Sequence, residues 1–319
     1  MPSDDAARSL LACPRCHGPL ERTDQAPVEL RCVACGTAYP IVGGLPRFVS
    51  SDNYAASFGD QWNRHRLTQL DSHPGLPISR RRVFETTGWA ERLDGETILE
   101  AGSGAGRFTE VLLTTGARVY SFDYSTAVDA NAKSRGDSPQ LTLFQADIFA
   151  IPVQPKAFDK VICIGVLQHT PDPERAFKSL ATHVRPGGEL VVDLYPKRLT
   201  ALLSWKYVLR PITRTMDRAR LYRLVEHTVD ALLPLTVWLR RRGGRAGARL
   251  MPIVEYSTLG LPPAVNREWA VLDTFDMYSP AHDHPQTLET LRRGYEEVAF
   301  VDVHVAPGPN GIIGRGRRR

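Results

Sequence analysis

The stretch Thr97-Ile-Leu-Glu-Ala-Gly102-Ser-Gly104-Ala-Gly106-Arg107 decides the fold of this chain. It begins with an apolar run that is typical of a buried strand, and a glycine-rich turn follows before a helical pattern starts. Glycines at alternate positions let the backbone turn tightly and let a ligand approach it closely. The stretch therefore predicts a strand, a turn and a helix, with a ligand site at the turn.

Apolar strands alternate with helical patterns through residues 96–196, as the βαβ units of a parallel sheet require. A turn is expected at Pro186-Gly187-Gly188. A last helix and two strands within residues 285–319 should complete the sheet. The expected strands are residues 97–101, 118–122, 141–145, 158–165, 189–195, 300–305 and 311–316, and the expected helices are residues 107–115, 174–183 and 287–298. Open α/β sheets bind their ligands at the carboxyl ends of the strands.

Three features narrow the ligand that the glycine turn would bind. Arg107 stands where a dinucleotide-binding fingerprint has its third glycine. Glu100 precedes the first glycine by two positions, where a carboxylate would repel a pyrophosphate but suit a cationic, zwitterionic ligand. Asp123 ends the second strand, a position suited to bind two hydroxyls of a ribose. Together these features favour S-adenosylmethionine over a dinucleotide.

The central segment resembles a class I S-adenosylmethionine-dependent methyltransferase of the small-molecule type. The resemblance rests on the glycine turn and on four further motifs in the right order: Phe122-Asp-Tyr-Ser125, Gln145-Ala-Asp-Ile148, Val166-Leu-Gln-His-Thr-Pro-Asp172 and Pro186-Gly-Gly188. It implies a Rossmann-like α/β sheet that is mostly parallel, with an antiparallel last strand.

The resemblance also implies roles for individual residues in binding the cofactor. Gly102 and Gly104 would pass under the methionine portion and the ribose, and Asp123 would bind the ribose hydroxyls. Asp147 would accept a hydrogen bond from the adenine amino group, while the amide of Ile148 meets a ring nitrogen. Glu100 would act near the methionine amine, directly or through water. A capping or turn role is the alternative for both aspartates.

Four cysteines lie near the start of the chain, in the pairs Cys13-Pro-Arg-Cys16 and Cys32-Val-Ala-Cys35. The doubled spacing is typical of a zinc ribbon with a closed, structural site of four thiolates. Two disulfides or four free thiols are the alternatives, and a reducing cytoplasm disfavours the disulfides. With the following stretch Tyr39-Pro-Ile-Val-Gly-Gly-Leu-Pro-Arg-Phe48, residues 1–50 resemble a Trm112-like zinc domain, a module fused to or partnered with methyltransferases.

Residues 51–95 are expected to form a linker with cofactor-lid helices. Phe58 and Trp62 are four residues apart and would share one helix face, which a core-facing stripe also explains. In resembling proteins with this fused architecture, a similar aromatic-glutamine-tryptophan helix covers the cofactor. The resemblance therefore implies that Tyr54, Gln61 and Trp62 contribute to the cofactor site.

The insertion at residues 197–284 contains helical apolar spacing between Leu221 and Leu233 and predicts a helical cap that shapes an acceptor pocket. A dimer surface or a face that meets a lipid-like substrate is the alternative. Histidines, carboxylates and a tyrosine lie close together in the sequence at the end of this insertion. The stretch is expected to be either a loop or part of an acceptor site, to which Tyr278 and His282 would contribute. His169, after the fourth strand, is a candidate general base or a structural residue of the pocket.

Composition limits the classes of partner. The 319 residues carry a net charge of +5, but four arginines stand among the last five residues, and the rest of the chain is nearly neutral. Charge alone therefore makes no case for nucleic acid. No apolar run approaches the roughly 18 residues of a membrane span, and the N-terminus lacks the pattern of a secretory signal, so a cytoplasmic protein is expected.

Two functions follow. The favoured one is methyl transfer to a small-molecule acceptor, at O, N or C, in a biosynthetic pathway. The alternative is an RNA methyltransferase that uses the zinc ribbon and the arginine-rich tail to hold its substrate. The Asn/Asp-Pro-Pro-Tyr type of tetrapeptide common in amine-directed nucleic-acid enzymes of this fold is missing after the fourth strand. The acceptor and the oligomeric state stay open.

Overall fold

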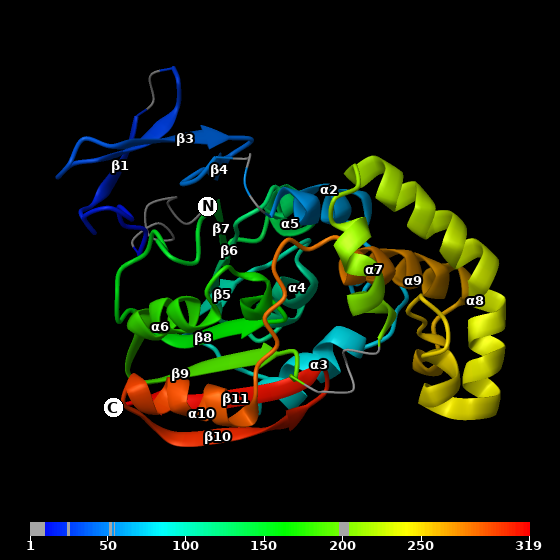
Figure 1. Cartoon of the computed structure of the whole chain (residues 1–319). Helices are drawn as coiled ribbons and strands as arrows, with labels where there is room; N and C mark the ends of the chain where they lie inside the picture. The colour runs from blue at the N-terminus through cyan, green and yellow to red at the C-terminus, as the bar shows by residue number, and fades with distance from the viewer. Residues whose placement is uncertain (1–9, 24–25, 51–52, 54, 198–203) are drawn as a thin grey trace.

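The computed structural model describes residues 10–23, 26–50, 53, 55–197 and 204–319, and for residues 56–58 and 60 the backbone alone. A seven-stranded sheet forms the body of the molecule. A small four-stranded sheet lies beyond one end of it, and a helical cap lies on the opposite side (Figure 1). This arrangement puts the cap over the carboxyl ends of the central strands.

The large sheet has the strand order β10-β11-β9-β8-β5-β6-β7. Strands β5 to β9 pair in parallel, whereas β11 pairs antiparallel with both β9 and β10. The prediction of a mostly parallel sheet closed by an antiparallel strand is confirmed. The strands are β5 (Thr97–Ala101), β6 (Arg118–Asp123), β7 (Leu141–Gln145), β8 (Phe158–Ile164), β9 (Val184–Leu194), β10 (Phe300–Gly308) and β11 (Gly311–Arg318).

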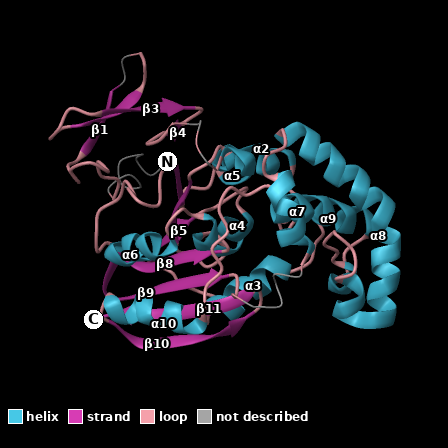
Figure 2. Ribbon diagram, viewed as in Figure 1, coloured by secondary structure: helices cyan, strands magenta, loops and turns pink. Residues whose placement is uncertain are grey.

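Helices cover both faces of this sheet (Figure 2). Successive strand residues alternate between two hydrophobic clusters, because side chains alternate across a strand. Ile98 packs with α3 and α4, whereas Leu99 belongs to the cluster that contains residues of α6 and α10. The helices are α2 (Ala56–Arg64), α3 (Ile78–Thr87), α4 (Arg107–Leu113), α5 (Ala127–Arg135), α6 (Pro173–His183) and α10 (Leu288–Glu297).

One expected turn is wrong. Strand β9 already begins at Val184 and runs through the segment Pro186-Gly187-Gly188. A Cβ on Gly188 would lie 2.8 Å from the carbonyl oxygen of Asp159, so glycine allows β9 to approach β8 closely. The pairing of the two strands shifts register here, and this irregularity absorbs the bend that the sequence suggested.

The small sheet contains β1 (Leu20–Thr23), β2 (Glu29–Cys32), β3 (Ala38–Val42) and β4 (Leu45–Pro46), and we call residues 10–48 the ribbon. The ribbon packs beside β7, where the amide of Phe48 donates to the carbonyl of Gln145 and Arg47 pairs with Asp129. Buried ribbon residues such as Leu11 and Tyr39 share one hydrophobic cluster with the large sheet. The ribbon is thus an extension of the main core.

The cap consists of α7 (Trp205–Thr213), α8 (Arg218–Ala248, kinked at Gly244) and α9 (Pro263–Tyr278). Its own small core includes Val225, Val229 and Phe275. The helical cap that the sequence predicted is present, and its last helix extends over residues that could also be read as a loop. Among the residues described, no helix combines the length and the hydropathy needed to cross a bilayer.

The C-terminal arginines are part of the sheet. Arg315 donates to the carbonyls of Glu85 and Thr86, and Arg318 donates to three carbonyls at the end of α6 and the start of β9. Arg317 forms an ion pair with Asp302. Because β11 carries these residues, the segment is a strand and not a free basic tail.

Candidate cofactor and acceptor site

A cavity of about 830 Å³ lies between the carboxyl ends of the central strands and the cap. The sheet side is lined by the glycine turn, by Asp123 at the end of β6 and by Ile148 in the loop after β7. The cap side is lined by residues of α7, α8 and α9 and by the loop around Tyr256. One cavity therefore joins the predicted cofactor residues to the insertion.

The glycine turn lines the cavity with backbone atoms. Gly102 has a φ of +79°, and a Cβ at this position would lie 2.3 Å from Cγ2 of Val166. Gly104 also has a positive φ, and its amide donates to Oδ2 of Asp123 at 2.9 Å. Both positions favour glycine because of the left-handed backbone, and Gly102 also needs it for the close approach of Val166.

Replacing Gly102 by alanine should unfold the chain more readily and weaken ligand binding in the cavity. The left-handed conformation alone costs about 1–2 kcal/mol for a residue with a side chain, and the contact with Val166 adds overpacking. Gly260→Ala is the matched control, because Gly260 has a φ of +75° but open space where its Cβ would lie. Chemical denaturation measures both variants, and equal losses of stability would contradict a steric role for Gly102.

Asp123 lines the cavity with a carboxylate whose position is set by its own loop. Oδ1 accepts hydrogen bonds from the amide and the hydroxyl of Ser125, at 2.8 and 2.7 Å. Oδ2 accepts the Gly104 amide and has capacity for a further donor. Burial raises the pKa of Asp123, and hydrogen bonds from Ser125, Gly104 and Tyr124 oppose that increase. The carboxylate is thus held rigidly at the cavity wall.

Asp147 and Ile148 occupy the loop after β7. Ile148 lines the cavity, whereas Asp147 is not among its lining residues. Oδ1 of Asp147 accepts the amide of Phe149 at 2.9 Å, as a turn residue does. The adenine contact expected of Asp147 remains a prediction, and the turn contact shows what orients its side chain.

Glu100 lies under the glycine turn and not at the cavity wall. Side chains alternate along β5, so Glu100 points toward α4, where Thr109 and Ser121 donate to its Oε2 at 2.6 and 2.7 Å. Burial raises the pKa of Glu100 to about 7, and these two hydrogen bonds oppose that effect. The expected role beside a methionine amine, directly or through water, remains a prediction.

The two neighbouring lid candidates on α2 have different surroundings. Trp62 lines the cavity, with its ring 3.5 Å from where a Cβ on Gly104 would lie. Gln61 is almost fully buried away from the cavity, and its Nε2 donates to the carbonyl of Leu272 in α9. Gln61 therefore joins α2 to the cap. Tyr54 lies outside the described residues.

His169 lines the cavity at its border with the cap. Its Nδ1 lies 3.2 Å from the carbonyl oxygen of His282, and its ring meets that of Tyr195 edge-on with centroids 5.5 Å apart. Burial lowers the pKa of His169 to about 4, so its imidazole is neutral at physiological pH.

The other two candidates from the cap side do not line the cavity. The hydroxyl of Tyr278 donates to the carbonyl of Pro252 at 2.7 Å and ties α9 to the preceding loop. The ring of His282 stacks with that of His284, and its backbone carbonyl lies 3.2 Å from Nδ1 of His169. Tyr278 packs in the core of the cap, and the acceptor contacts expected of Tyr278 and His282 remain predictions.

Sequence reasoning missed the α9 residues that do line the cavity. Trp269, Asp273 and Asp276 recur at helical spacing and share one face of α9. Burial raises the pKa of both Asp273 and Asp276 to about 6. The helical spacing of these three residues could have predicted their shared face, but the sequence around the two aspartates is also compatible with a loop.

Asp273 belongs to a hydrogen-bonded network that crosses from the cap to the glycine turn. It accepts from Nε2 of Gln69 and from the hydroxyl of Tyr256. Oε1 of Gln69 in turn accepts from Arg107 at 2.6 Å, and the Arg107 guanidinium lies over the ring of Trp269. Burial lowers the pKa of Arg107 to about 10. The network holds α9 against the start of α4.

Asp276 differs from Asp273 in its hydrogen bonding. No hydrogen-bond partner for it exists within the described ranges, and its charged neighbours Lys206 and Arg210 are shared with Asp283. Asp276 lines the cavity. It is therefore available to a molecule in the cap half of the cavity.

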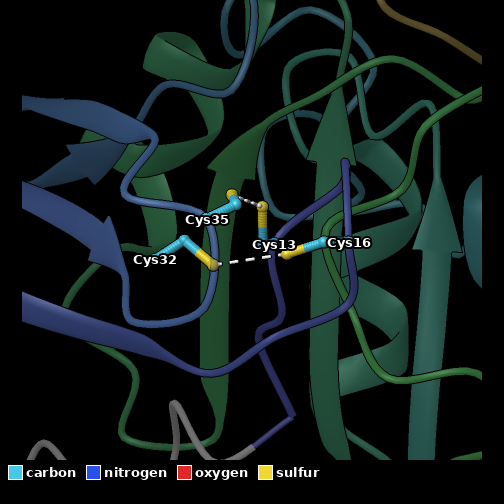
Figure 3. Close-up of side chains that lie close together, drawn as sticks. All are labelled: Cys13, Cys16, Cys32 and Cys35. Atoms are coloured by element: carbon cyan, nitrogen blue, oxygen red, sulfur yellow. Dashed lines mark hydrogen bonds between the residues drawn. The ribbon is translucent and has the colours of Figure 1, made fainter.

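The four N-terminal cysteines converge on one point of the ribbon (Figure 3). All four sulfurs lie within 4.8 Å of one another, with Cys13 and Cys35 at 3.7 Å and Cys16 and Cys32 at 3.4 Å. A tetrahedral zinc ion with bonds of about 2.3 Å separates its sulfur ligands by about 3.8 Å. The cluster therefore has the size and the ligands of a structural zinc site, whereas the disulfide alternative is not formed.

Two segments of the chain match known protein families. Residues 99–192 match the family described as a methyltransferase domain, and residues 9–44 match the family described as Trm112p-like protein. The first match covers the glycine turn and the strands that carry the cofactor candidates. The second match covers all four cysteines.

The curated relatives include ubiquinone biosynthesis O-methyltransferases. That of Coxiella burnetii is 33% identical over 113 residues, which are 35% of this chain and 48% of the relative, so the chain spans about half of its length. That of Xylella fastidiosa is 26% identical over 216 residues, 65% of this chain and 82% of the relative. A solved structure of Haemonchus contortus phosphoethanolamine N-methyltransferase 2 covers 82% of this chain and 47% of its own, at 15% identity and a TM-score of 0.44.

Proposed function

We propose that this chain, in which a class I S-adenosylmethionine-dependent methyltransferase domain follows a Trm112-like domain, methylates a small-molecule acceptor held between the sheet and the cap. The observation that carries the proposal is the single cavity that contains both the glycine turn and the α9 face. Relatives named for O-methylation in ubiquinone biosynthesis support a small acceptor.

The sheet half of the cavity suits the cofactor. Gly102 and Gly104 offer backbone without side chains, Asp123 offers a carboxylate oxygen to ribose hydroxyls, and Trp62 covers the turn. Bound S-adenosylmethionine would supply a methyl group on a positively charged sulfur, which is already an activated leaving group. The protein then has to orient the acceptor in line and exclude water.

The cap half suits the acceptor. Aromatic side chains of Tyr195, Tyr256 and Trp269 line it together with Asp276. We assign Asp276 to accept the proton that a hydroxyl or protonated amine loses on methylation, because its carboxylate is free of protein hydrogen bonds within the described ranges. His169 faces the same half and is proposed to position the acceptor or to share this role.

The pH dependence of turnover tests the assignment of Asp276. A carboxyl group whose pKa is raised to about 6 by burial is protonated below that pH, so kcat should fall as the pH drops through about 6. Asp276→Asn should lower kcat about 100-fold and remove this acidic limb, while the affinity for S-adenosylhomocysteine stays unchanged.

His169→Asn provides the comparison for Asp276→Asn. It should lower kcat but keep the limb near pH 6, because burial places the pKa of His169 near 4. The assignment of Asp276 is contradicted if its variant retains the limb or loses cofactor affinity and kcat to the same extent. A loss of cofactor affinity in His169→Asn would instead make His169 a structural residue.

The RNA alternative has less support. The ribbon packs at the β7 edge of the sheet, whereas the C-terminal arginines lie on β11 near the other edge. Those arginines are engaged with backbone carbonyls and with Asp302. The ribbon and the arginine-bearing strand therefore lie near opposite edges of the sheet, and the arginines are already engaged.

One experiment distinguishes the two functions. The purified chain is incubated with a cell extract and S-adenosylmethionine labelled in its methyl group, and the label is measured in small-molecule, RNA and protein fractions. We expect label in the small-molecule fraction that depends on Asp123. Label confined to RNA or protein would overturn the proposal.

We further propose that the four cysteines bind one structural zinc ion. The convergence of their sulfurs supports this, as does the surrounding hydrogen bonding: Tyr39 contacts the sulfur of Cys13, and Thr37 that of Cys35. Four protein ligands close the site and leave no open position, so the metal would hold the ribbon together and take no part in the transfer.

A further inference from the structure

The solvent-facing sides of α7 and α8 carry large apolar side chains. On α7, Trp205, Val208 and Ile212 recur at helical spacing and are all exposed. On α8, Leu224, Leu235 and Trp238 lie along one stripe of the helix, and Trp238 is 52% exposed. Leu250 is also exposed, and its carbonyl accepts from the indole of Trp205. We call these seven residues the outer face of the cap.

This face is distinct from the one that holds the cap together. Leu221, Val225 and Val229 point from α8 into the core of the cap and are buried. A helix with one apolar side needs only that side to pack. The exposed stripe on the other side of α8 is therefore not required by the fold.

The segment that carries the outer face of the cap is rich in basic residues, and eight of them are exposed. Residues 205–250 contain eleven lysines and arginines but three aspartates and glutamates, so the rest of the chain carries a net negative charge. Two of the three acidic residues, Glu226 and Asp230, already pair with Arg267, and Asp217 caps α8. The guanidinium of Arg242 lies over the ring of Trp238, at 5.7 Å from its centroid.

We propose that the outer face of the cap docks on the surface of an anionic lipid bilayer. Tryptophan and aliphatic side chains insert into the boundary between head groups and acyl chains, while flanking arginines bind anionic head groups. The positive charge concentrated on these helices is complementary to the negative charge of the anionic head groups. Aliphatic residues favour this partner over RNA, whose single strands are bound by aromatic and basic side chains.

The position of the cavity gives this docking a consequence. Lys206 of α7 and Arg240 and Arg245 of α8 line the same cavity as the glycine turn. Docking would place the cap that borders the cavity next to the lipid surface. The inference concerns binding and does not depend on methyl transfer, so its failure and that of the proposed function are separable.

Co-sedimentation of the full chain with vesicles tests the docking. We expect binding to phosphatidylglycerol vesicles, much weaker binding to phosphatidylcholine vesicles, and loss of binding at high salt. Leu235→Ser combined with Trp238→Ser should lower the partition coefficient at least about tenfold. Arg241→Glu combined with Arg242→Glu should abolish the preference for phosphatidylglycerol.

The matched control removes exposed apolar side chains elsewhere. Val33 and Val42 of the ribbon are 58% and 55% exposed, and changing both to serine should leave vesicle binding intact. Circular dichroism and S-adenosylhomocysteine affinity verify that every variant is folded. Equal binding to both kinds of vesicle, or binding to neither, would overturn the inference. So would displacement of the vesicles by polyuridylate. A dimer in solution that the Leu235/Trp238 double variant dissociates would also overturn it.

Discussion

Replacing Asp123 by alanine should lower the affinity for S-adenosylmethionine and S-adenosylhomocysteine by about 100-fold, equivalent to about 2.7 kcal/mol. The carboxylate lines the cavity, and its Oδ2 can accept a hydrogen bond beyond the one from Gly104. Removing an ionised hydrogen-bond acceptor lowers the binding free energy more than removing a neutral acceptor does. Isothermal titration with S-adenosylhomocysteine measures the effect without turnover.

The variant also removes the hydrogen bond that holds Gly104, so a control must separate this contact from ligand binding. Ser125→Ala removes the hydroxyl that donates to Oδ1 at 2.7 Å but leaves the carboxylate in place. It should lower the affinity less than tenfold. Thermal unfolding of both apo-proteins checks the fold. An Asp123→Ala protein that is stably folded and binds the ligand with unchanged affinity would contradict the assignment.

Removing zinc should have the largest effect on stability. The purified wild-type chain should contain one zinc ion per molecule, and Cys16→Ser should contain less than about a tenth of that, because a structural site needs all four thiolates. Small zinc domains commonly unfold without their metal. Leu11 and Tyr39 of the ribbon share a cluster with Ile148, which lines the cavity, so cofactor affinity should fall as well.

Metal analysis and thermal unfolding, with and without a chelator, measure this effect. Cys163→Ala is the control, because Cys163 is buried in β8 far along the chain from the cluster and its loss should leave the zinc content at one. A wild-type chain that is folded, reduced and free of zinc would overturn the metal site. A Cys16→Ser chain with full zinc content would do the same.

Local patterns in the sequence predicted much of the sheet. Strands β5 and β7 begin and end at the expected residues, and α6 begins one residue before its expected start. The four cysteines converge as their spacing predicts. These features depend on short stretches, in which hydrophobic periodicity and backbone preference determine the structure.

Other features depend on how distant segments pack. Gln61 and Trp62 are neighbours in one helix, yet only Trp62 lines the cavity, because adjacent helical residues point in different directions and α9 covers the other one. The C-terminal arginines could have formed a free basic tail, but strand pairing with β9 commits them to the sheet. Neither outcome follows from the local sequence.

The sequence by itself determined the strand-and-turn unit around Gly102, the position of Asp123 at the end of β6, and the convergence of four thiols. Each results from residues close together in the chain, whose geometry short-range sterics restrict strongly. Only the tertiary structure decided that Asp276 lies in the cavity and that Glu100 does not. Such positions depend on contacts between residues far apart in the chain, which no local preference specifies.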